Sequence, residues 1–210
     1  MADLSIERAH ARRGHRLIAG VDEVGRGALY GPVVAAAVIL PSAWLTGKPP
    51  AWLSRADDSK LLTPRTRADL FGRILEAVPA VGVGRCTPAE IDVLNIYRAS
   101  HEAMRRALKA LAVAPDVVLV DGRAEIPGLG IAQKAIVQGD RKCLSIAAAS
   151  IVAKVLRDAI MVRFDGRSPG YGLARNKGYG TEEHYRALAE LGPTAFHRKS
   201  FRLVTQPTLF

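Results

Sequence analysis

The sequence predicts an α/β fold whose strands carry carboxylates at their ends. Two short apolar runs, 17–22 and 117–121, each end in an aspartate with glycine close behind. Segments with helical spacing follow these strands along the chain. Because α/β sheets usually bind their ligands at the carboxyl ends of parallel strands, we expect Asp22 and Asp121 to lie together if their strands are parallel neighbours.

The first half of the chain alternates strands with helices. Strands are predicted at 17–22, 33–40 and 81–85, with a proline-rich loop at 41–50. Thr63 and Pro64 indicate the capped start of a helix with apolar residues through Val78, and a second helix follows Thr87 and Pro88. A third helix is predicted over about 95–111, where alanine recurs at helical spacing.

The second half begins with the buried strand at 117–121 and continues into an alanine-rich helix predicted over 142–162. Ser150, Lys154 and Asp158 recur at intervals of four and therefore share one polar face of that helix. This pattern is typical of phosphate contacts with a further carboxylate, and equally of a surface Lys–Asp pair. The glycine-rich basic segment at 165–201 predicts a small helical appendage that contacts substrate.

Composition limits the classes of function. The 210 residues are 49% hydrophobic, enough for one domain with a sizeable core, and the net charge of +10 indicates a polyanionic partner, or a basic surface without one. Cys86 and Cys143 form no CxxC pair, so we expect a reduced, cytoplasmic protein without a zinc site. No apolar run is long enough to span a bilayer.

The most informative stretch is the acidic pair Asp22–Glu23, followed at once by the turn Gly25–Arg26–Gly27. Carboxylates bind cations, whereas backbone amides and an arginine bind phosphate. Mg²⁺ is commonly held by one or two carboxylates together with substrate phosphates, so the combination indicates metal-assisted chemistry on a phosphodiester. A solvated turn is the alternative for this stretch alone.

Taken together, these motifs resemble the type 2 ribonucleases H, the bacterial ribonuclease HII family, from about residue 17 to 204. The matching strings are AGVDEVGRG at 19–27, GPVVAAA at 31–37, DSK at 58–60, VDG at 120–122, IAAASIVAK at 146–154, RD at 157–158, KGYGT at 177–181 and HRKSF at 197–201.

The resemblance implies a ribonuclease H-like mixed sheet of about five strands, the first three antiparallel, flanked by helices and followed by a C-terminal helical part. It implies an endonuclease that hydrolyses the RNA strand of RNA/DNA hybrids and nicks at ribonucleotides embedded in duplex DNA. Two divalent ions, Mg²⁺ or Mn²⁺, would promote cleavage to 5′-phosphate and 3′-hydroxyl ends. The metal-binding and catalytic acids by this resemblance are Asp22, Glu23, Asp121 and Asp158.

The resemblance also assigns substrate contacts. Gly25, Arg26 and Gly27 would contact the ribose 2′-hydroxyl, the group that distinguishes RNA from DNA, and Tyr179 would stack on the next sugar. Ser59, Lys60, Ser150 and Lys154 are the candidates for phosphate contacts. Tyr30 replaces an expected small residue, and we expect it to alter the shape of the substrate groove.

The chain is expected to divide into a catalytic domain at 1–164, a helical substrate-contact segment at 165–204 and a flexible tail at 205–210. In the tail, Gln206, Leu209 and Phe210 are similar to peptides that dock on the replication sliding clamp. A frayed apolar terminus is the alternative. We expect a monomer.

Two other functions share these features. A related metal-dependent nuclease acting on DNA junctions would use the same acids without sensing a 2′-hydroxyl. A non-catalytic nucleic-acid binding module would bind tightly without cutting. The sequence leaves open the physiological metal, the ranking of hybrids against single ribonucleotides, clamp binding by the tail and the oligomeric state.

Overall fold

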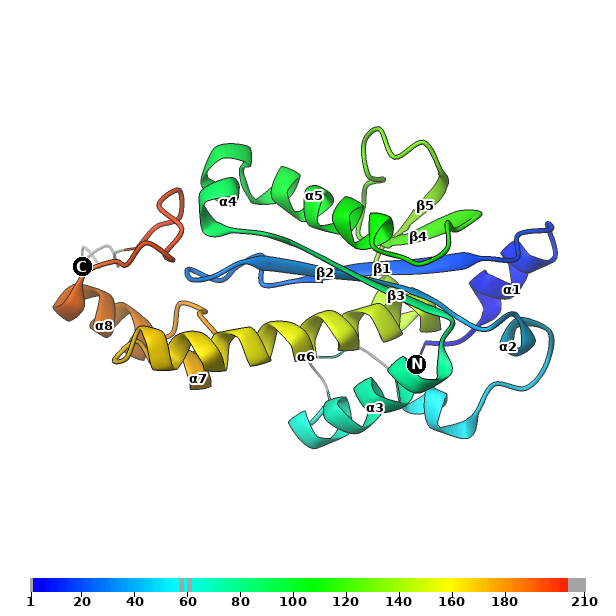
Figure 1. Cartoon of the computed structure of the whole chain (residues 1–210), viewed down its shortest axis with the longest axis horizontal. Coiled ribbons are helices and arrows are strands. Elements are labelled where there is room, and N and C mark those ends of the chain that lie inside the picture. The colour runs from blue at the N-terminus through cyan, green and yellow to red at the C-terminus, as the bar shows by residue number, and fades with distance from the viewer. Residues whose placement is uncertain (1, 57–58, 60–61, 204–210) are drawn as a thin grey trace, which may run out of the picture.

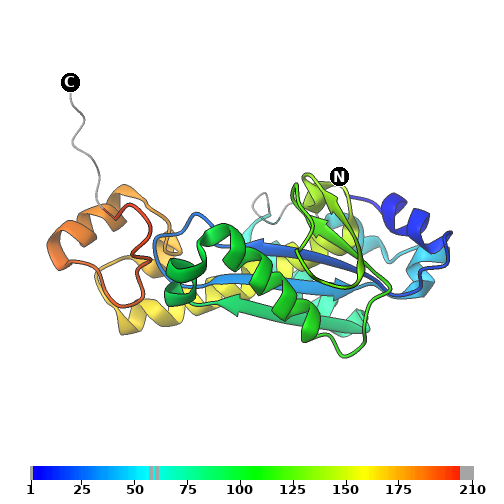
Figure 2. The same ribbon diagram turned by 90° about the horizontal axis from the view of Figure 1, so that it is seen from above.

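The computed structural model describes residues 2–56, 59 and 62–203. One five-stranded sheet lies between two layers of helices, and a small helical part extends from one end of the molecule (Figure 1). The same layers are seen from above in Figure 2. No helix in the described part of the chain is long and apolar enough to cross a membrane.

The sheet contains β1 (Ile18–Val24), β2 (Val33–Ile39), β3 (Ala80–Cys86), β4 (Val117–Asp121) and β5 (Ala132–Ile136), in the order β3-β2-β1-β4-β5. β1 and β3 both pair antiparallel with β2, whereas β4 is parallel to β1 and to β5. This confirms the predicted mixed sheet. The sequence did not locate β5, because its residues AQKAI are mostly half-exposed and include few β-branched side chains.

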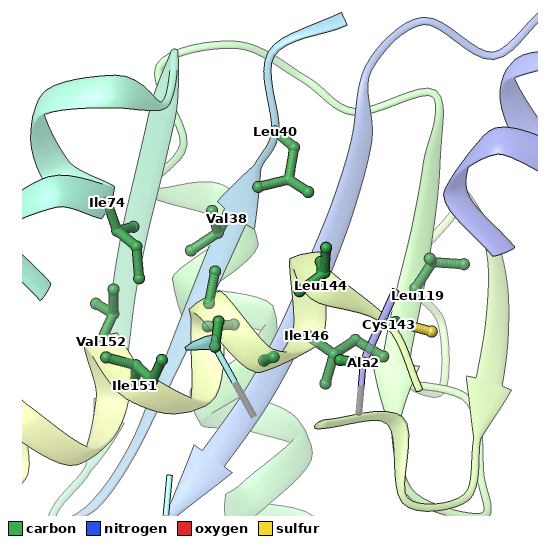
Figure 3. Close-up of a cluster of buried hydrophobic side chains, with 14 of the residues drawn as sticks. Ala2, Val38, Leu40, Ile74, Leu119, Cys143, Leu144, Ile146, Ile151 and Val152 are labelled. Atoms are coloured by element: carbon green, nitrogen blue, oxygen red, sulfur yellow. The ribbon is translucent and has the colours of Figure 1, made fainter. Parts of the chain in front are cut away.

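Each face of the sheet has its own hydrophobic core. α6 (Leu144–Arg167) and α3 (Pro64–Ala77) cover one face, where Ile74 meets Val38, Ile151 and Val152 (Figure 3). α5 (Ile96–Lys109), preceded by α4 (Pro88–Leu94), covers the other face. All of β2 is buried because both of its faces are covered.

The helix starts predicted from the sequence are confirmed by their caps. The Thr63 hydroxyl accepts the Thr66 N–H at the start of α3, and Thr87 forms a capping box with Glu90 at α4. The Asn95 side chain accepts the Arg98 N–H at α5. The short helical elements α2 (Ser42–Thr46), η1 (Ala51–Arg55) and η2 (Gly139–Arg141) have no such side-chain cap, and the sequence did not reveal them.

α1 (Ser5–Ala11) is tied to the start of α6. The Glu7 carboxylate is fully buried and accepts hydrogen bonds from both the N–H and the hydroxyl of Ser145, each at 2.8 Å. Glu7 therefore supplies from a distant segment the acceptor that the first turn of α6 needs, since no cap residue of α6 provides one. Burial raises the pKa of Glu7, and the bonds from Ser145 oppose that shift.

The C-terminal part contains α7 (Leu173–Asn176) and α8 (Glu182–Leu191) and has a third core, centred on Tyr30. Tyr30 is fully buried, with its ring edge-on to His197 at 4.7 Å and its hydroxyl 2.9 Å from that of Ser168. Tyr30 is therefore a core residue and not a surface one, and its effect on the shape of the substrate groove stays a prediction. α6 runs through the predicted boundary at 164/165, and the domain division stays a prediction.

Glycines allow α5 to approach the sheet closely. A Cβ atom added at Gly84 on β3 would lie 2.1 Å from the backbone oxygen of Ala103 on α5. A Cβ atom at Gly72, inside α3, would meet nothing within 4 Å. Gly84 is therefore required for the close packing of α5 on the sheet, whereas Gly72 can be replaced without a clash.

We predict that Gly84→Ala destabilises the fold by at least about 1–3 kcal/mol, because the added methyl group forces α5 away from the sheet. Gly72→Ala is the matched control and should stabilise by roughly 0.5–1 kcal/mol, because alanine favours a helix interior. Urea unfolding followed by circular dichroism measures both changes. Equal stability of Gly84→Ala and the unmodified protein would contradict the close packing described above.

Candidate active site

The acidic pair ends β1 at the edge of the buried sheet. Successive side chains of a strand point to opposite faces, so Asp22 and Glu23 lie on either side of the sheet. Asp22 is buried on the side of α6, and its Oδ1 accepts a hydrogen bond from the Glu23 N–H at 2.7 Å. Glu23 lines a cavity on the side of α5, and its Oε1 accepts from Arg26 Nη1 at 3.2 Å.

Asp121 reaches the same edge from β4. Val120 pairs with Val21 in the parallel ladder, so Asp121 falls beside Asp22. The N–H of Gly139 donates to Asp121 Oδ1 at 2.7 Å and fixes the orientation of that carboxylate. The parallel pairing of β1 and β4 thus brings together three of the acids singled out in the sequence.

These carboxylates interact electrostatically. Burial raises the pKa of Asp22 well above its ordinary value, and the charges of Glu23, Asp121 and Asp140 raise it further. Burial also raises the pKa of Glu23 to about 7, with Arg26 opposing the shift and Asp121 adding to it. A positive ion at this edge would relieve the repulsion.

Asp140 was not singled out in the sequence. It lies on η2, directly after the Gly139 that donates to Asp121, and its charge acts on Asp22. The sequence did contain one indication of this residue. Asp140 is an acid that lies between Asp121 and the alanine-rich helix, and the first turns of that helix pack against β1.

Asp158 has different surroundings. It lies eight residues beyond Ser150 on α6, roughly 12 Å farther along the helix axis. Its Oδ1 accepts from Lys154 Nζ at 2.8 Å, and its Oδ2 lies 4.0 Å from Arg67 Nη2. The two cations hold Asp158 in an ion-paired cluster. The Lys–Asp pair that the spacing had left open is present, but it is largely buried and does not lie at the surface.

Some of the candidate phosphate contacts lie near Asp158 and Arg67. The hydroxyls of Ser59 and Ser150 share a hydrogen bond of 3.0 Å, and Arg67 Nη1 donates to the Ser59 carbonyl at 2.7 Å. Ser59 and Ser150 are buried, and Lys154 is largely buried beside Asp158. Lys60 lies outside the described residues.

Two buried arginines hold the Gly25–Arg26–Gly27 turn. Arg198 donates to the carbonyls of Gly25 at 2.7 Å and Arg26 at 2.8 Å. Arg157 packs so closely that a Cβ atom on Gly25 would lie 2.1 Å from its Nε, and Gly25 has φ of +91°. Glycine is therefore required at position 25, whereas a Cβ atom at Gly27 would meet nothing within 4 Å.

Arg157 and Arg198 also connect this turn to the segment that carries Tyr179. Arg157 donates to the carbonyls of Tyr30 and Lys177, and its guanidinium lies 5.4 Å from the centre of the Tyr179 ring. An isolated bridge pairs Ala28 with Tyr179. Tyr179 and the glycine turn are thus held as one unit beside the acids.

Comparison with known proteins identifies this arrangement. The profile of the family described as Ribonuclease HII matches residues 19–204, which is most of the chain. The chain belongs to the ribonuclease HII family. Ribonuclease HII of Moorella thermoacetica is 53% identical over 93% of this chain and 91% of that relative, and that of Geotalea uraniireducens is 49% identical over 97% and 90%.

A solved structure shows the same fold. The crystal structure of ribonuclease H2 from Pyrococcus horikoshii has a TM-score of 0.74 and 25% identity, covering 89% of this chain and 94% of that one. The ribonuclease HII in the PCNA complex from Archaeoglobus fulgidus has a TM-score of 0.71 and 25% identity, with coverage of 92% and 98%. As a ribonuclease HII, the chain is a ribonuclease H hydrolase that cleaves the RNA strand of RNA/DNA hybrids.

A buried histidine pair supports the Tyr179 segment. His184 Nδ1 lies 3.0 Å from the Tyr179 carbonyl, which can only accept, so Nδ1 donates and Nε2 is an acceptor. His197 Nε2 then donates to His184 Nε2 at 3.2 Å, and His197 Nδ1 accepts the Thr194 N–H at 2.9 Å. Both imidazoles are neutral in this arrangement, because an added proton would place two donors face to face.

We predict that acid weakens the fold through this pair. Burial, with the charge of His184 added, lowers the pKa of His197 to about 4, below the roughly 6.5 of an unfolded histidine. The unfolded chain therefore binds more protons between these values, so the contribution of the neutral pair is full above pH 6.5 and declines towards pH 4.

Urea midpoints measured between pH 7 and pH 5 test this. His197→Asn should be less stable at pH 7 and should lose less stability on acidification than the unmodified protein. If the stability of both proteins fell equally with falling pH, the histidine pair would be excluded as the source of the acid sensitivity.

Proposed function

We propose that Asp22, Glu23 and Asp121 are the acids that carry the hydrolysis, and that the chain cuts both RNA/DNA hybrids and single ribonucleotides in duplex DNA. The observation that supports this most strongly is the convergence of these carboxylates at the ends of two adjacent parallel strands, where burial and then the charges of Glu23 and Asp121 raise the pKa of Asp22. Such coupled acids are typical of functional sites, because the fold alone gains nothing from the repulsion.

The donor set suits hard divalent cations. All of its ligand atoms are carboxylate oxygens, the class that Mg²⁺ and Mn²⁺ prefer. Within the described residues, no three or more His, Cys, Asp or Glu side chains form a ready cluster for an ion. Mg²⁺ commonly takes one or two carboxylates from the protein and completes its shell with substrate phosphates and water.

Two divalent ions bound there would supply activation of the attacking water and stabilisation of the leaving 3′-oxygen, giving 5′-phosphate and 3′-hydroxyl ends. The protein's own contribution is to hold the carboxylates in place before substrate arrives. The Glu23 N–H donates to Asp22 Oδ1 at 2.7 Å, the Gly139 N–H holds Asp121, and Arg26 holds Glu23.

The turn Gly25–Arg26–Gly27 is proposed to sense the ribose 2′-hydroxyl. Its backbone is fixed by Arg198, so a hydroxyl can be recognised without first ordering a loop. Tyr179, whose ring lies 5.4 Å from the Arg157 guanidinium, is proposed to stack on the adjacent sugar. Ser59, Lys60, Ser150 and Lys154 are proposed phosphate contacts, consistent with the net charge of +10.

A cleavage gel tests this function. With Mg²⁺, the unmodified protein should cut an RNA/DNA hybrid and nick a DNA duplex at a single ribonucleotide, but leave an all-DNA duplex intact. Asp22→Asn is the inactive control. Cutting of the all-DNA duplex would favour a DNA-junction nuclease, and binding without cutting would favour a non-catalytic module.

The fourth acid can be assigned in the same gel. The sequence prediction is Asp158, whereas the contacts of the structure favour Asp140, whose charge acts on Asp22. We predict that Asp140→Asn lowers kcat by about a hundredfold or more, and that Asp158→Asn, which only releases Lys154 and Arg67, changes KM more than kcat. The reverse order of effects on kcat would restore Asp158 as the fourth acid.

We further propose that the tail docks on a sliding clamp. The Archaeoglobus fulgidus neighbour was solved as a PCNA:RNase HII complex. The tail residues Gln206, Leu209 and Phe210 lie outside the described residues, so the proposal rests on their sequence. The monomeric state and the cytoplasmic location are also proposals from the sequence.

Deletion of residues 206–210 should abolish capture of the protein by an immobilised bacterial clamp, because the two apolar side chains of the peptide are lost. Cleavage of a short hybrid should stay unchanged, since the tail is not part of the acid cluster. Thr208→Ala is the matched control and should retain capture. Undiminished capture after the deletion would disprove the proposal.

A further inference from the structure

A cavity opens beside the acids on the side of α5. It has a volume of about 310 Å³ and is lined by Glu23 and Asp121 at one end and by Tyr97, Ser100 and His101 of α5. A second hollow, of about 410 Å³, lies on the other side of Tyr97 and His101 and extends past Arg98 to Pro127. The two hollows share this pair of side chains, and together we call them the α5 cleft.

An aromatic pair stands at the junction of the two hollows. The rings of Tyr97 and His101 are one helical turn apart on α5 and meet edge-to-face, with centroids 4.6 Å apart. Tyr97 is 49% exposed, unlike the inward-facing residues of α5, which pack on the sheet. An exposed ring supported by a second ring is a stacking surface for a nucleobase.

The cleft also carries groups that suit a polar, anionic chain. Arg123 lines the first hollow and Arg98 the second, and neither guanidinium has a hydrogen bond or ion pair with another described residue. The Ser100 hydroxyl at the wall of the first hollow is buried and has no hydrogen-bond partner among the described residues. This oxygen is itself inaccessible from the hollow, so the two guanidinium groups are what suit an anionic chain.

The dimensions restrict the occupant. Pockets of roughly 300–1,000 Å³ hold one small ligand, and each hollow therefore suits about one nucleotide. A single unpaired strand that continues from the acids, with one nucleotide in each hollow, fits these volumes.

We propose that the α5 cleft binds a single-stranded extension of the substrate, with a base stacked on Tyr97 and its phosphates near Arg98 and Arg123. This rests on the proposed function, because the cleft begins at Glu23 and Asp121. Hybrids with an unpaired tail next to the cut are then bound more tightly than blunt hybrids.

Binding of labelled substrates to the Asp22→Asn protein tests the proposal without cleavage. The probes are a blunt RNA/DNA hybrid and the same hybrid with a three-nucleotide tail at either end of the RNA strand. A tail of one polarity should tighten binding by about tenfold, which corresponds to about 1.4 kcal/mol, because one of its bases stacks on Tyr97.

Tyr97→Ala should abolish the gain from the tail and leave the affinity for the blunt hybrid unchanged, whereas Tyr97→Phe should keep it. Val93→Ala, at an 84% exposed position of α4 outside the cleft, is the matched control and should keep it as well. No gain from either tail, or an equal loss for blunt and tailed hybrids in Tyr97→Ala, would overturn the proposal.

A cleavage assay distinguishes failure of the α5-cleft proposal from failure of the proposed function. The Tyr97→Ala protein with all acids intact should cut the blunt hybrid at the normal rate. Failure of the unmodified protein to cut that hybrid would count against the proposed function. A missing tail effect together with normal cutting would count against the α5 cleft alone.

Discussion

The cost of holding carboxylates together at the edge of the buried sheet is the constraint around which this molecule is organised. Asp22, Glu23 and Asp121 lie at this edge, although burial raises the pKa of Asp22 and of Glu23 and the charge of Asp121 raises both further. Folding alone would avoid this cost. This cost is tolerated because β1 lies between two hydrophobic cores. The free energy gained by burying these cores outweighs the electrostatic cost at the acids. The same two cores fix the pairing of β1 with β4, and the paired strands leave the acids little freedom to move apart.

The sequence predicted most of the fold because its signals are local. Thr63, Thr87 and Asn95 mark helix starts through their own side chains, and the apolar runs of β1, β2 and β4 are recognisable without tertiary information. β5 was missed because its own residues have little strand propensity, and it is the pairing with β4 that stabilises it as a strand. Asp140 was missed for a related reason, because its neighbours in space come from β1 and β4 rather than from its own segment.

The polar face of α6 shows what the spacing of residues in the sequence can and cannot predict. Ser150, Lys154 and Asp158 do share a face, as their spacing indicates, but the helix is long enough to take them to different surroundings. Ser150 meets Asp22, while Lys154 and Asp158 bond each other beside Arg67. Spacing identifies which side of a helix a residue occupies. Which partner it meets depends on the position of the helix along the sheet, and that is set by packing.

The link between α1 and α6 gives the extreme N-terminus a role beyond covering the core. Glu7 is the acceptor for the first turn of the helix that also supplies Ser150, and η2 with Asp140 directly precedes that turn. Trimming the chain before residue 10, or replacing Glu7 during engineering, would leave the Ser145 amide without its acceptor. An affinity tag is therefore better attached by a spacer than by shortening this leading helix.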